Sequence, residues 1–379
     1  TVRSRVHRMT EEGIIRGFTI KTSSRNVKAL VEIRIDVNTD TQEIAKELAG
    51  YDGVTEVFEV TGDQDIIAIV DVESSQHLND IIERVRRYDN ILSTRTALIT
   101  PFTRDGQVDE ESLRRLVNFQ EDNGVNTLVP CGSTGESAML SHEEHLRVIS
   151  IVRDEAKKAK VLAGAGSNCT TEAVGLSKSA EDIGADGILS ISPYYVKPTQ
   201  EGIYQHYKAI EEAIDIPIVV YNIPGRTGSN ITVDTMLRLA ELDGIVGVKE
   251  ASGNMSQIQN IIARRPEGFE VLSGDDSITL ALMSMGADGV ISVTSNCCPG
   301  LVSEMVRNAQ SDKFEIAKSI HNKLLPIFGA LFCESNPIPI KYVMGIMGYG
   351  NGSPRLPLTP LSENGRAILD PILKDLGIA

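Results

Sequence analysis

The chain has 379 residues, of which 41% are hydrophobic and 23% charged, and its formal net charge is −15. This length exceeds one typical domain, so we expect two or three. No run of 18 apolar residues occurs, so no membrane span is expected, and the acidic balance argues against nucleic-acid binding along the whole chain. The five cysteines lack the CxxC spacing of a metal site and fit a reducing compartment, so we expect a cytoplasmic protein.

The first 28 residues depart from this acidic balance, because they hold seven Lys or Arg against two Glu. The stretch VRSRVHRMTEEGIIRGF is typical of a basic helix that ends at Gly13 and is followed by a strand. We interpret residues 1–22 as the remainder of a helix-turn-helix domain. A recognition helix needs partner helices to hold it in the major groove, so we expect this chain not to bind DNA on its own.

Residues 23–96 show strand and helix patterns in the order strand, helix, strand, strand, helix, strand. The expected elements lie at residues 28–37, 41–51, 54–62, 65–73, 76–88 and 91–95. This βαββαβ order predicts a ferredoxin-like α+β domain. The order and the EEGIIRGF lead-in resemble the effector domain of the leucine-responsive, or feast/famine, transcription regulators. That resemblance implies a module that self-associates through its sheet and can bind amino acids.

After this module, short apolar runs of β type alternate with amphipathic helices. Eight such runs occur, at residues 96–102, 126–130, 160–166, 187–193, 217–223, 245–251, 270–276 and 289–295. Eight strand–helix units predict an α/β fold, the (β/α)8 TIM barrel. We assign residues 97–310 to the barrel, with Thr96 as the changeover from the first domain, and residues 311–379 to a C-terminal helical extension.

In such a barrel the chemistry lies at the carboxyl ends of the strands. Lys249 follows the apolar run IVGV, and a buried lysine amine becomes a nucleophile, so Lys249 is a candidate for a Schiff base. The alternative is a rim lysine that pairs with Glu250 or an aspartate. Tyr221 ends the neighbouring strand, where its phenol either relays protons or belongs to a core aromatic with a tethered hydroxyl.

Two further loops at these strand ends offer sites for anions. GSTGE (132–136) combines small hydroxyls with backbone N–H groups, a combination suited to a carboxylate. Arg226 lies in a Pro–Gly loop and can bind a second carboxylate through its planar guanidinium. A candidate imine lysine, a phenol and two anion sites together indicate an aldolase that joins a keto acid to a second carboxylated partner.

Residues 96–379 are similar to the dihydrodipicolinate synthase family. The motifs that carry the resemblance occur in the order GSTGES, PYYVKPTQEGIYQHY, YNIPGRTG, VGVKEAS, LSGDD, GVISVTSN and ESNPIPIKY. The resemblance implies condensation of pyruvate with L-aspartate semialdehyde to 4-hydroxy-tetrahydrodipicolinate, in lysine and diaminopimelate biosynthesis. It also implies a homotetramer of two tight dimers and no cofactor beyond the covalent Schiff base.

The same resemblance implies catalytic roles for four residues. Lys249 forms the imine with pyruvate. Tyr221 shuttles protons, helped by Ser133 and by Tyr195, which in this family comes from the neighbouring subunit. Ser133 stands where the family more often has threonine, so the hydroxyl is kept but has more χ1 freedom.

Four more residues are expected to bind substrate. The resemblance implies that Thr134 binds the pyruvate carboxylate, that Arg226 orients the aldehyde, and that main-chain groups of Gly274 and Ile291 line the pocket. Two sister families, the N-acetylneuraminate lyases and keto-deoxy-sugar-acid aldolases, share the lysine and the barrel, but Arg226 in PGRTG argues against both. The alternative from another class is an amino-acid-responsive transcription regulator with a barrel sensor, which would have no need of Lys249.

His142 and His145 lie three residues apart at the start of a predicted helix. This spacing could hold a metal, but a solvated helix start is the commoner reading, and we expect no metal site. The resemblance offers a third interpretation, an allosteric pocket for L-lysine at the tight dimer interface. The residues that match this pocket are Ser137, Ala138, His142, His145, Asn168, Glu172 and Tyr194. We therefore expect feedback inhibition by L-lysine, with Glu172 pairing the ligand's ammonium.

Overall fold

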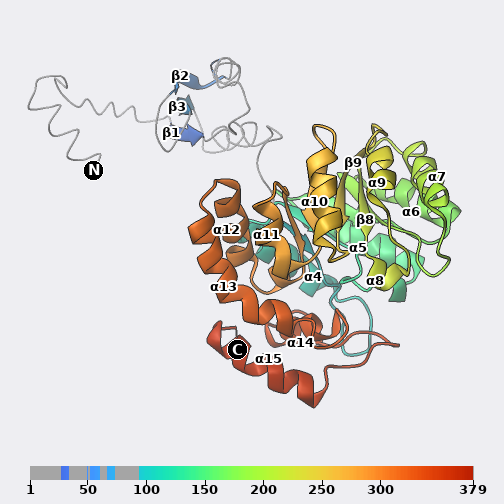
Figure 1. Cartoon of the computed structure of the whole chain (residues 1–379). Helices are drawn as coiled ribbons and strands as arrows, with labels where there is room; N and C mark the ends of the chain where they lie inside the picture. The colour runs from blue at the N-terminus through green and yellow to red at the C-terminus, as the bar shows by residue number, and fades with distance from the viewer. Residues whose placement is uncertain (1–26, 34–48, 50–51, 60–65, 73–93, 379) are drawn as a thin grey trace, which may run out of the picture. The chain divides into compact units, whose positions relative to one another are not determined.

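The chain forms two compact units, residues 1–91 and 92–379 (Figure 1). The computed structural model describes residues 27–33, 49, 52–59, 66–72 and 94–378. Four predicted features lie outside these residues: the helix-turn-helix remainder at 1–22, the helix at 41–51 apart from residue 49, the helix at 76–88, and the segment 91–93.

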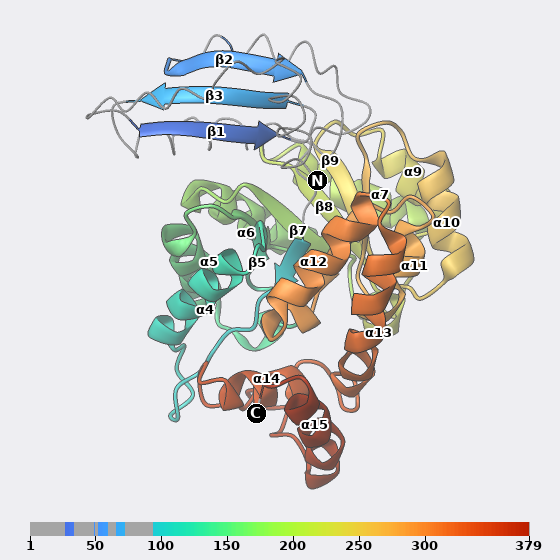
Figure 2. The ribbon, with the colours of Figure 1, turned by 90° about the vertical axis from the view of Figure 1, so that its left-hand side faces the viewer.

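The described part of the first unit is an antiparallel sheet in the order β1-β3-β2. Figure 2 shows its three strands side by side: β1 (Val27–Ile33), β2 (Val54–Glu59) and β3 (Ile66–Val72). They match three of the predicted strands. The split βαβ arrangement pairs its second and third strands as a hairpin and places the first beside the third, as observed.

Eight parallel strands close the barrel of the second unit, in the order β10-β11-β4-β5-β6-β7-β8-β9. They are β4 (Thr94–Ala97), β5 (Thr127–Val129), β6 (Lys160–Gly164), β7 (Gly187–Ile191), β8 (Ile218–Asn222), β9 (Ile245–Glu250), β10 (Glu270–Ser273) and β11 (Gly289–Ser292). All eight overlap predicted runs, and the predicted TIM barrel is confirmed.

The first barrel strand starts earlier than expected. β4 begins at Thr94 and pairs with β11 on one edge and with β5 on the other. The assignment of Thr94 and Arg95 to the small sheet, with Thr96 as the changeover, is therefore wrong, and these residues belong to the barrel. The physical reason is closure, because a strand in a closed barrel must bond along both edges, and residues 94–97 are the ones in register with β5 and β11.

Helices cover the outside of the barrel, and α13 to α15 form the C-terminal extension (Figures 1 and 2). The helices are α4 (Glu110–Asp122), α5 (His142–Glu155), α6 (Thr170–Ile183), α7 (Gln200–Glu211), α8 (Pro224–Thr227), α9 (Val233–Leu239), α10 (Met255–Arg264), α11 (Thr279–Met283), α12 (Pro299–Gln310), α13 (Phe314–Ala330), α14 (Ile338–Ile346) and α15 (Glu363–Asp375), with 3-10 turns η1 (Ser137–Met139), η2 (Asp276–Ile278) and η3 (Thr294–Asn296). Among the described residues no helix has both the length and the apolar character needed to cross a membrane.

The near repeats GADGI and GADGV, which precede β7 and β11, perform the same structural task twice. The Asp186 carboxylate accepts the backbone N–H of Val161 in β6 at 2.7 Å, and the Asp288 carboxylate accepts that of Val271 in β10 at 2.7 Å. Each aspartate also binds an arginine from the adjoining helix segment. Each repeat therefore links a strand to its predecessor at the amino-terminal end of the barrel.

The interior of the barrel is filled by a small apolar layer that lies inside the main core. Its buried members are Ala97, Val129, Leu162, Leu189, Val219, Tyr221, Leu272 and Ile291. Polar groups follow directly after these strands, so the packed interior forms the floor on which the candidate site is built.

Candidate active site

Lys249 lies near the carboxyl end of β9 and is only 5% exposed. Burial lowers the pKa of Lys249 to about 8, the Asp276 carboxylate opposes this shift, and the Arg226 charge adds to it. With this pKa about one amine in ten is uncharged at pH 7, against fewer than about one in a thousand for an ordinary lysine. The strand therefore delivers a nucleophilic amine to the barrel mouth.

Tyr221 stands beside this lysine on β8. The two residues are direct partners in the β8–β9 register, and Lys249 Nζ lies 4.3 Å from the centroid of the Tyr221 ring. Burial raises the pKa of Tyr221 to about 12, while the Arg226 charge and a hydrogen bond with Ser133 oppose the shift. The phenol is therefore protonated at neutral pH, next to the amine and connected to the hydroxyl of the GSTGE loop.

Asp276 is a buried carboxylate at the start of η2, 4% exposed. Its Oδ2 accepts the backbone N–H groups of Val293 and Thr294, at 3.1 and 2.9 Å, and the Thr294 hydroxyl at 2.9 Å. Burial raises the pKa of Asp276, and these donors oppose that rise. Because a backbone N–H can only donate, the arrangement favours the ionised carboxylate, whose charge reaches Lys249.

Thr134 and Arg226 are joined through one residue of the C-terminal extension. The Asn336 side-chain amide donates to Thr134 Oγ1 at 3.0 Å, and Arg226 Nη2 donates to the Asn336 carbonyl oxygen at 2.8 Å. Thr134 is 3% exposed, whereas Arg226 is exposed at its rim position in α8. The two predicted anion-binding groups therefore lie around the same mouth as Lys249.

Gly274 lies against the lysine chain. A Cβ added at Gly274 would meet Ala251 Cβ at 2.7 Å, Glu250 O at 3.1 Å and Lys249 Cε at 3.2 Å. The position therefore requires glycine for close approach to the lysine. Ile291, 1% exposed in β11, contributes to the interior layer beneath the mouth.

Tyr195 is placed differently from the other predicted catalytic residues. Its side chain is 86% exposed, and its backbone has φ 71°, in the left-handed region that non-glycine residues rarely adopt. Its backbone N–H donates to the Thr227 carbonyl oxygen at 3.1 Å, which fixes the loop beside α8. Tyr194 is half-buried. Within one chain Tyr195 therefore projects into solvent.

The predicted allosteric residues are partly brought together. His142 Nε2 lies 2.8 Å from Glu172 Oε1, and the Ser167 hydroxyl donates to the other Glu172 oxygen. The Ser167 hydrogen bond is the main cause of a lowered pKa at Glu172, and His142 adds to it. Buried His145 contacts the Gly164 carbonyl oxygen at 2.7 Å, and burial lowers its pKa. The other expected residues are Asn168 and Ser137, half-buried, and Ala138, exposed.

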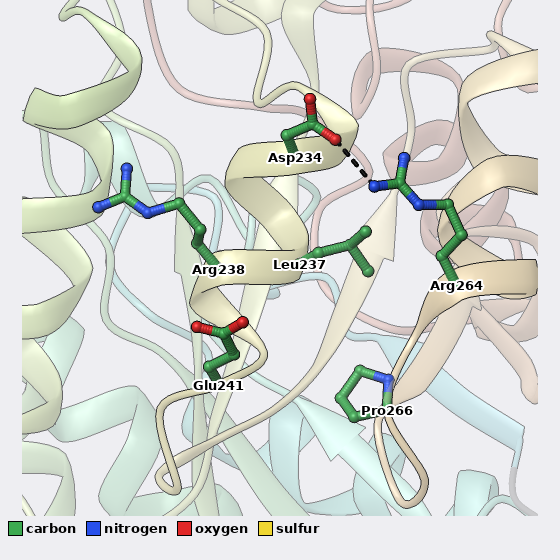
Figure 3. A pocket seen from close by; sticks show the side chains of 6 residues that line it. All are labelled: Asp234, Leu237, Arg238, Glu241, Arg264 and Pro266. Atoms are coloured by element: carbon green, nitrogen blue, oxygen red, sulfur yellow. Dashed lines mark hydrogen bonds and ion pairs between the residues drawn. The ribbon is translucent and has the colours of Figure 1, made fainter.

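A surface pocket between α9 and α10 is a different feature. Figure 3 shows Leu237 between Arg238 and Arg264, with Arg264 paired to Asp234 at 3.0 Å. Arg238 pairs with Glu201 at 3.0 Å. Both arginines are thus already paired, and none of the lining residues belongs to the group around Lys249. Within the described part of the chain, no group of three or more His, Cys, Asp or Glu is arranged to hold a metal ion.

The sequence did not single out three residues of this site. Asp276 lies in the quoted LSGDD motif, and Asn336 and Lys341 lie in ESNPIPIKY. Lys341 is 1% exposed, and its Nζ lies 2.8 Å from Glu136 Oε1 of the GSTGE loop. A lysine inside the apolar helix IPIKYVMGI was the available signal for this buried pair.

The second unit is a closed parallel barrel with a buried lysine and a phenol packed against it at the carboxyl ends of the strands. Residues 90–376 match the model of the Dihydrodipicolinate synthetase family, and residues 28–103 match the model of the Lrp/AsnC ligand binding domain. The chain therefore belongs to the dihydrodipicolinate synthetase family and is a lyase, with an Lrp/AsnC-type domain at its N-terminal side. Both resemblances predicted from the sequence are confirmed.

Relatives of known name support this assignment. A protein of Chloroherpeton thalassium named 4-hydroxy-tetrahydrodipicolinate synthase is 54% identical over 284 residues, which cover 74% of this chain and 94% of the relative. The pyruvate complex of the chloride-inhibited dihydrodipicolinate synthase from Acinetobacter baumannii is 46% identical, with a TM-score of 0.75, over 76% of this chain and all of the other. The lysine-bound enzyme from Cyanidioschyzon merolae is 38% identical, with a TM-score of 0.74, over 76% and 98% of the two chains.

Proposed function

We propose that this chain condenses pyruvate with L-aspartate semialdehyde through a Schiff base on Lys249, giving 4-hydroxy-tetrahydrodipicolinate in the cytoplasm. The observation that carries the proposal is the buried Lys249 amine, with a pKa of about 8, packed against the Tyr221 ring at 4.3 Å. A relative solved with pyruvate supports the choice of the first substrate.

The first half of the reaction forms the imine. Lys249 Nζ attacks pyruvate C2, the former carbonyl oxygen leaves as water, and a C=N bond forms. Thr134 and the GSTGE backbone bind the pyruvate carboxylate. Tyr221 carries the protons that this exchange requires, and Ser133, to which it is hydrogen-bonded, extends the relay.

The second half forms the carbon–carbon bond. Loss of a proton from pyruvate C3 gives an enamine, and its C3 attacks the aldehyde carbon of the semialdehyde. Arg226 uses its free N–H groups to hold the carboxylate of this second substrate. One Arg226 N–H donates to the Asn336 carbonyl oxygen, and this contact fixes the direction of the remaining guanidinium N–H groups. The amine of the semialdehyde then attacks the imine carbon and releases Lys249.

Borohydride trapping tests the proposal directly. Incubation of the intact chain with pyruvate and borohydride should give a mass adduct on the peptide that contains Lys249. Lys341 is a matched internal control, because burial lowers its pKa to about 8 as well, but it is paired to Glu136. An adduct on Lys341, or none on Lys249, would refute the imine mechanism, and the K249R variant should give none.

We also propose that L-lysine inhibits the enzyme at the cluster formed by His142, Glu172 and Ser167. The Glu172 carboxylate is held by two neighbours and is suited to pair an ammonium group. A relative solved with lysine bound supports the choice of lysine as the ligand. Millimolar L-lysine should lower the activity of the wild type but leave E172Q unaffected. The matched control is E201Q, an exposed glutamate on α7, which should remain inhibited.

The exposed Tyr195 supports a homo-oligomer in which it reaches the site of a partner subunit. Its ring is 86% exposed although its backbone is held in an unfavourable conformation, which indicates a defined position outside the chain's own site. We propose a tetramer of two tight dimers. Sedimentation of the intact chain tests the assembly, and a monomer at working concentration would contradict it.

A further inference from the structure

The GSTGE loop is bound to the C-terminal extension by buried polar contacts. Glu136 in this loop has φ 58° and is 1% exposed. Its Oε1 pairs with Lys341 Nζ at 2.8 Å, and its Oε2 accepts the backbone N–H of Arg355 at 2.8 Å. Lys341 Nζ also donates to the Thr100 carbonyl at 2.6 Å. The extension is therefore part of the architecture of the site.

Asn336 is a residue of the extension that contacts both predicted anion-binding groups. It is 6% exposed, and its Nδ2 donates to Thr134 Oγ1 at 3.0 Å. An amide nitrogen can only donate, so the Thr134 oxygen must be the acceptor. The hydroxyl hydrogen of Thr134 is consequently turned away from Asn336 and remains available to another acceptor, such as a substrate carboxylate.

The remaining atoms of Asn336 support this orientation of its amide. Its Oδ1 is buried and has no hydrogen-bond partner among the described residues, whereas rotating the amide would leave the N–H donors unpaired instead, and buried unpaired N–H groups are the rarer of the two. Its backbone carbonyl accepts Arg226 Nη2 at 2.8 Å. The side chain of Asn336 thus contacts the anion site at Thr134, and its backbone carbonyl contacts the anion site at Arg226.

We propose that Asn336 is a positioning residue that sets the donor direction of Thr134 toward the pyruvate carboxylate, independently of its backbone contact with Arg226. This inference rests on the proposed function. It predicts that changes of the side chain weaken binding of pyruvate and leave the subsite of the aldehyde intact, because every substitution keeps the backbone carbonyl.

Two substitutions separate this role from simple packing. N336A removes the donor, and N336D keeps the size of the side chain but makes it an acceptor. In N336D the carboxylate draws the Thr134 hydrogen toward itself and adds a negative charge beside the substrate's own. If Asn336 only filled space, N336A would weaken pyruvate binding more than N336D, since aspartate is nearly isosteric with asparagine and alanine is not.

The measurement is the pyruvate concentration that gives half-maximal borohydride trapping on Lys249, together with both KM values. One lost hydrogen bond to a charged group should raise this concentration about tenfold in N336A, and N336D should raise it further. The KM for the semialdehyde should stay within about twofold of wild type, since the Arg226 contact is kept. N322A, at an exposed asparagine of α13, is the matched control and should behave as wild type.

The possible results are distinct. The inference is overturned if the pyruvate concentration for half-maximal trapping is unchanged in N336D, or if this concentration lies closer to wild type in N336D than in N336A. Equal increases in both KM values would overturn it as well. Thermal unfolding of each variant identifies loss of structure, and N336Q, which keeps an amide donor, should recover part of the affinity. If the wild type itself forms no adduct with pyruvate, the proposed function fails and this inference falls with it.

Discussion

The two charges that act on Lys249 offer a test in which two substitutions have opposite effects. Burial lowers the pKa of Lys249 from 10.5 to about 8, the negative Asp276 opposes this lowering, and the positive Arg226 adds to it. Removing the Asp276 charge in D276N should therefore lower the pKa of Lys249 further. Removing the Arg226 charge in R226M should raise it.

The magnitude follows from the size of such charge effects. A nearby charge of either sign shifts the pKa of a buried group by about one unit or more, so D276N should bring the pKa of Lys249 to about 7 and R226M to about 9. At pH 7 the uncharged amine would rise from about one-tenth to about one-half in D276N and would fall to about one-hundredth in R226M. The initial rate of imine formation should change by about fivefold upward and tenfold downward.

The assay is the initial rate of borohydride trapping at saturating pyruvate, measured from pH 6 to pH 10. In the wild type the rate should rise with pH, with a midpoint near pH 8, because the amine reacts only when uncharged. The midpoint, unlike the total rate, is insensitive to partial unfolding. Midpoints that move in the same direction in both variants, or that do not move, would show that these charges do not control Lys249.

Three further predictions concern packing, assembly and stability. G274A should reduce trapping at least about tenfold, because the added Cβ meets Ala251 Cβ at 2.7 Å, whereas G175A, with open space around it, should match wild type. Mixing K249A with Y195F should restore about one-quarter of the activity if the tyrosine acts across a twofold interface, and no recovery would refute that assignment. K341M and E136Q should each lower the free energy of unfolding by about 3 kcal/mol, because each leaves a buried partner unpaired, and the double variant should lose less than their sum, as chemical denaturation would show.

The sequence was sufficient to predict the barrel and to group the candidate site residues at the carboxyl ends of its strands. Each strand is an apolar run between helices, and the polar residues after Tyr221 and Lys249 stand out because the strands themselves contain few. The exception is the start of β4, which was predicted later than observed. Thr94 lies in a short polar stretch with apolar residues before and after it, and only pairing with β5 and β11, distant in sequence, selects the residues that form the strand.

The contacts that orient the site were harder to predict, because they join segments far apart in the chain. Asn336 meets Thr134 across 202 positions, and Lys341 meets the Thr100 carbonyl across 241. Neither residue has a local pattern that indicates its partner. Asp276 is similar, since its carboxylate is recognised as a neighbour of Lys249 only after β10 and β9 pair. Local patterns therefore identified Lys249 and Tyr221 as candidates but not the residues that contact them.

The two family matches overlap over residues 90–103, which include β4. The residues of β4 cannot complete both domains at once. In the closed barrel both edges of β4 are occupied, by β5 and by β11, so its backbone groups are not available to a second sheet. Since Thr96 and Ala97 are also buried in the barrel, releasing β4 would open the barrel and expose its interior. The barrel therefore takes Thr94–Ala97, and any further strand of the N-terminal sheet has to come from residues other than these four or from another molecule.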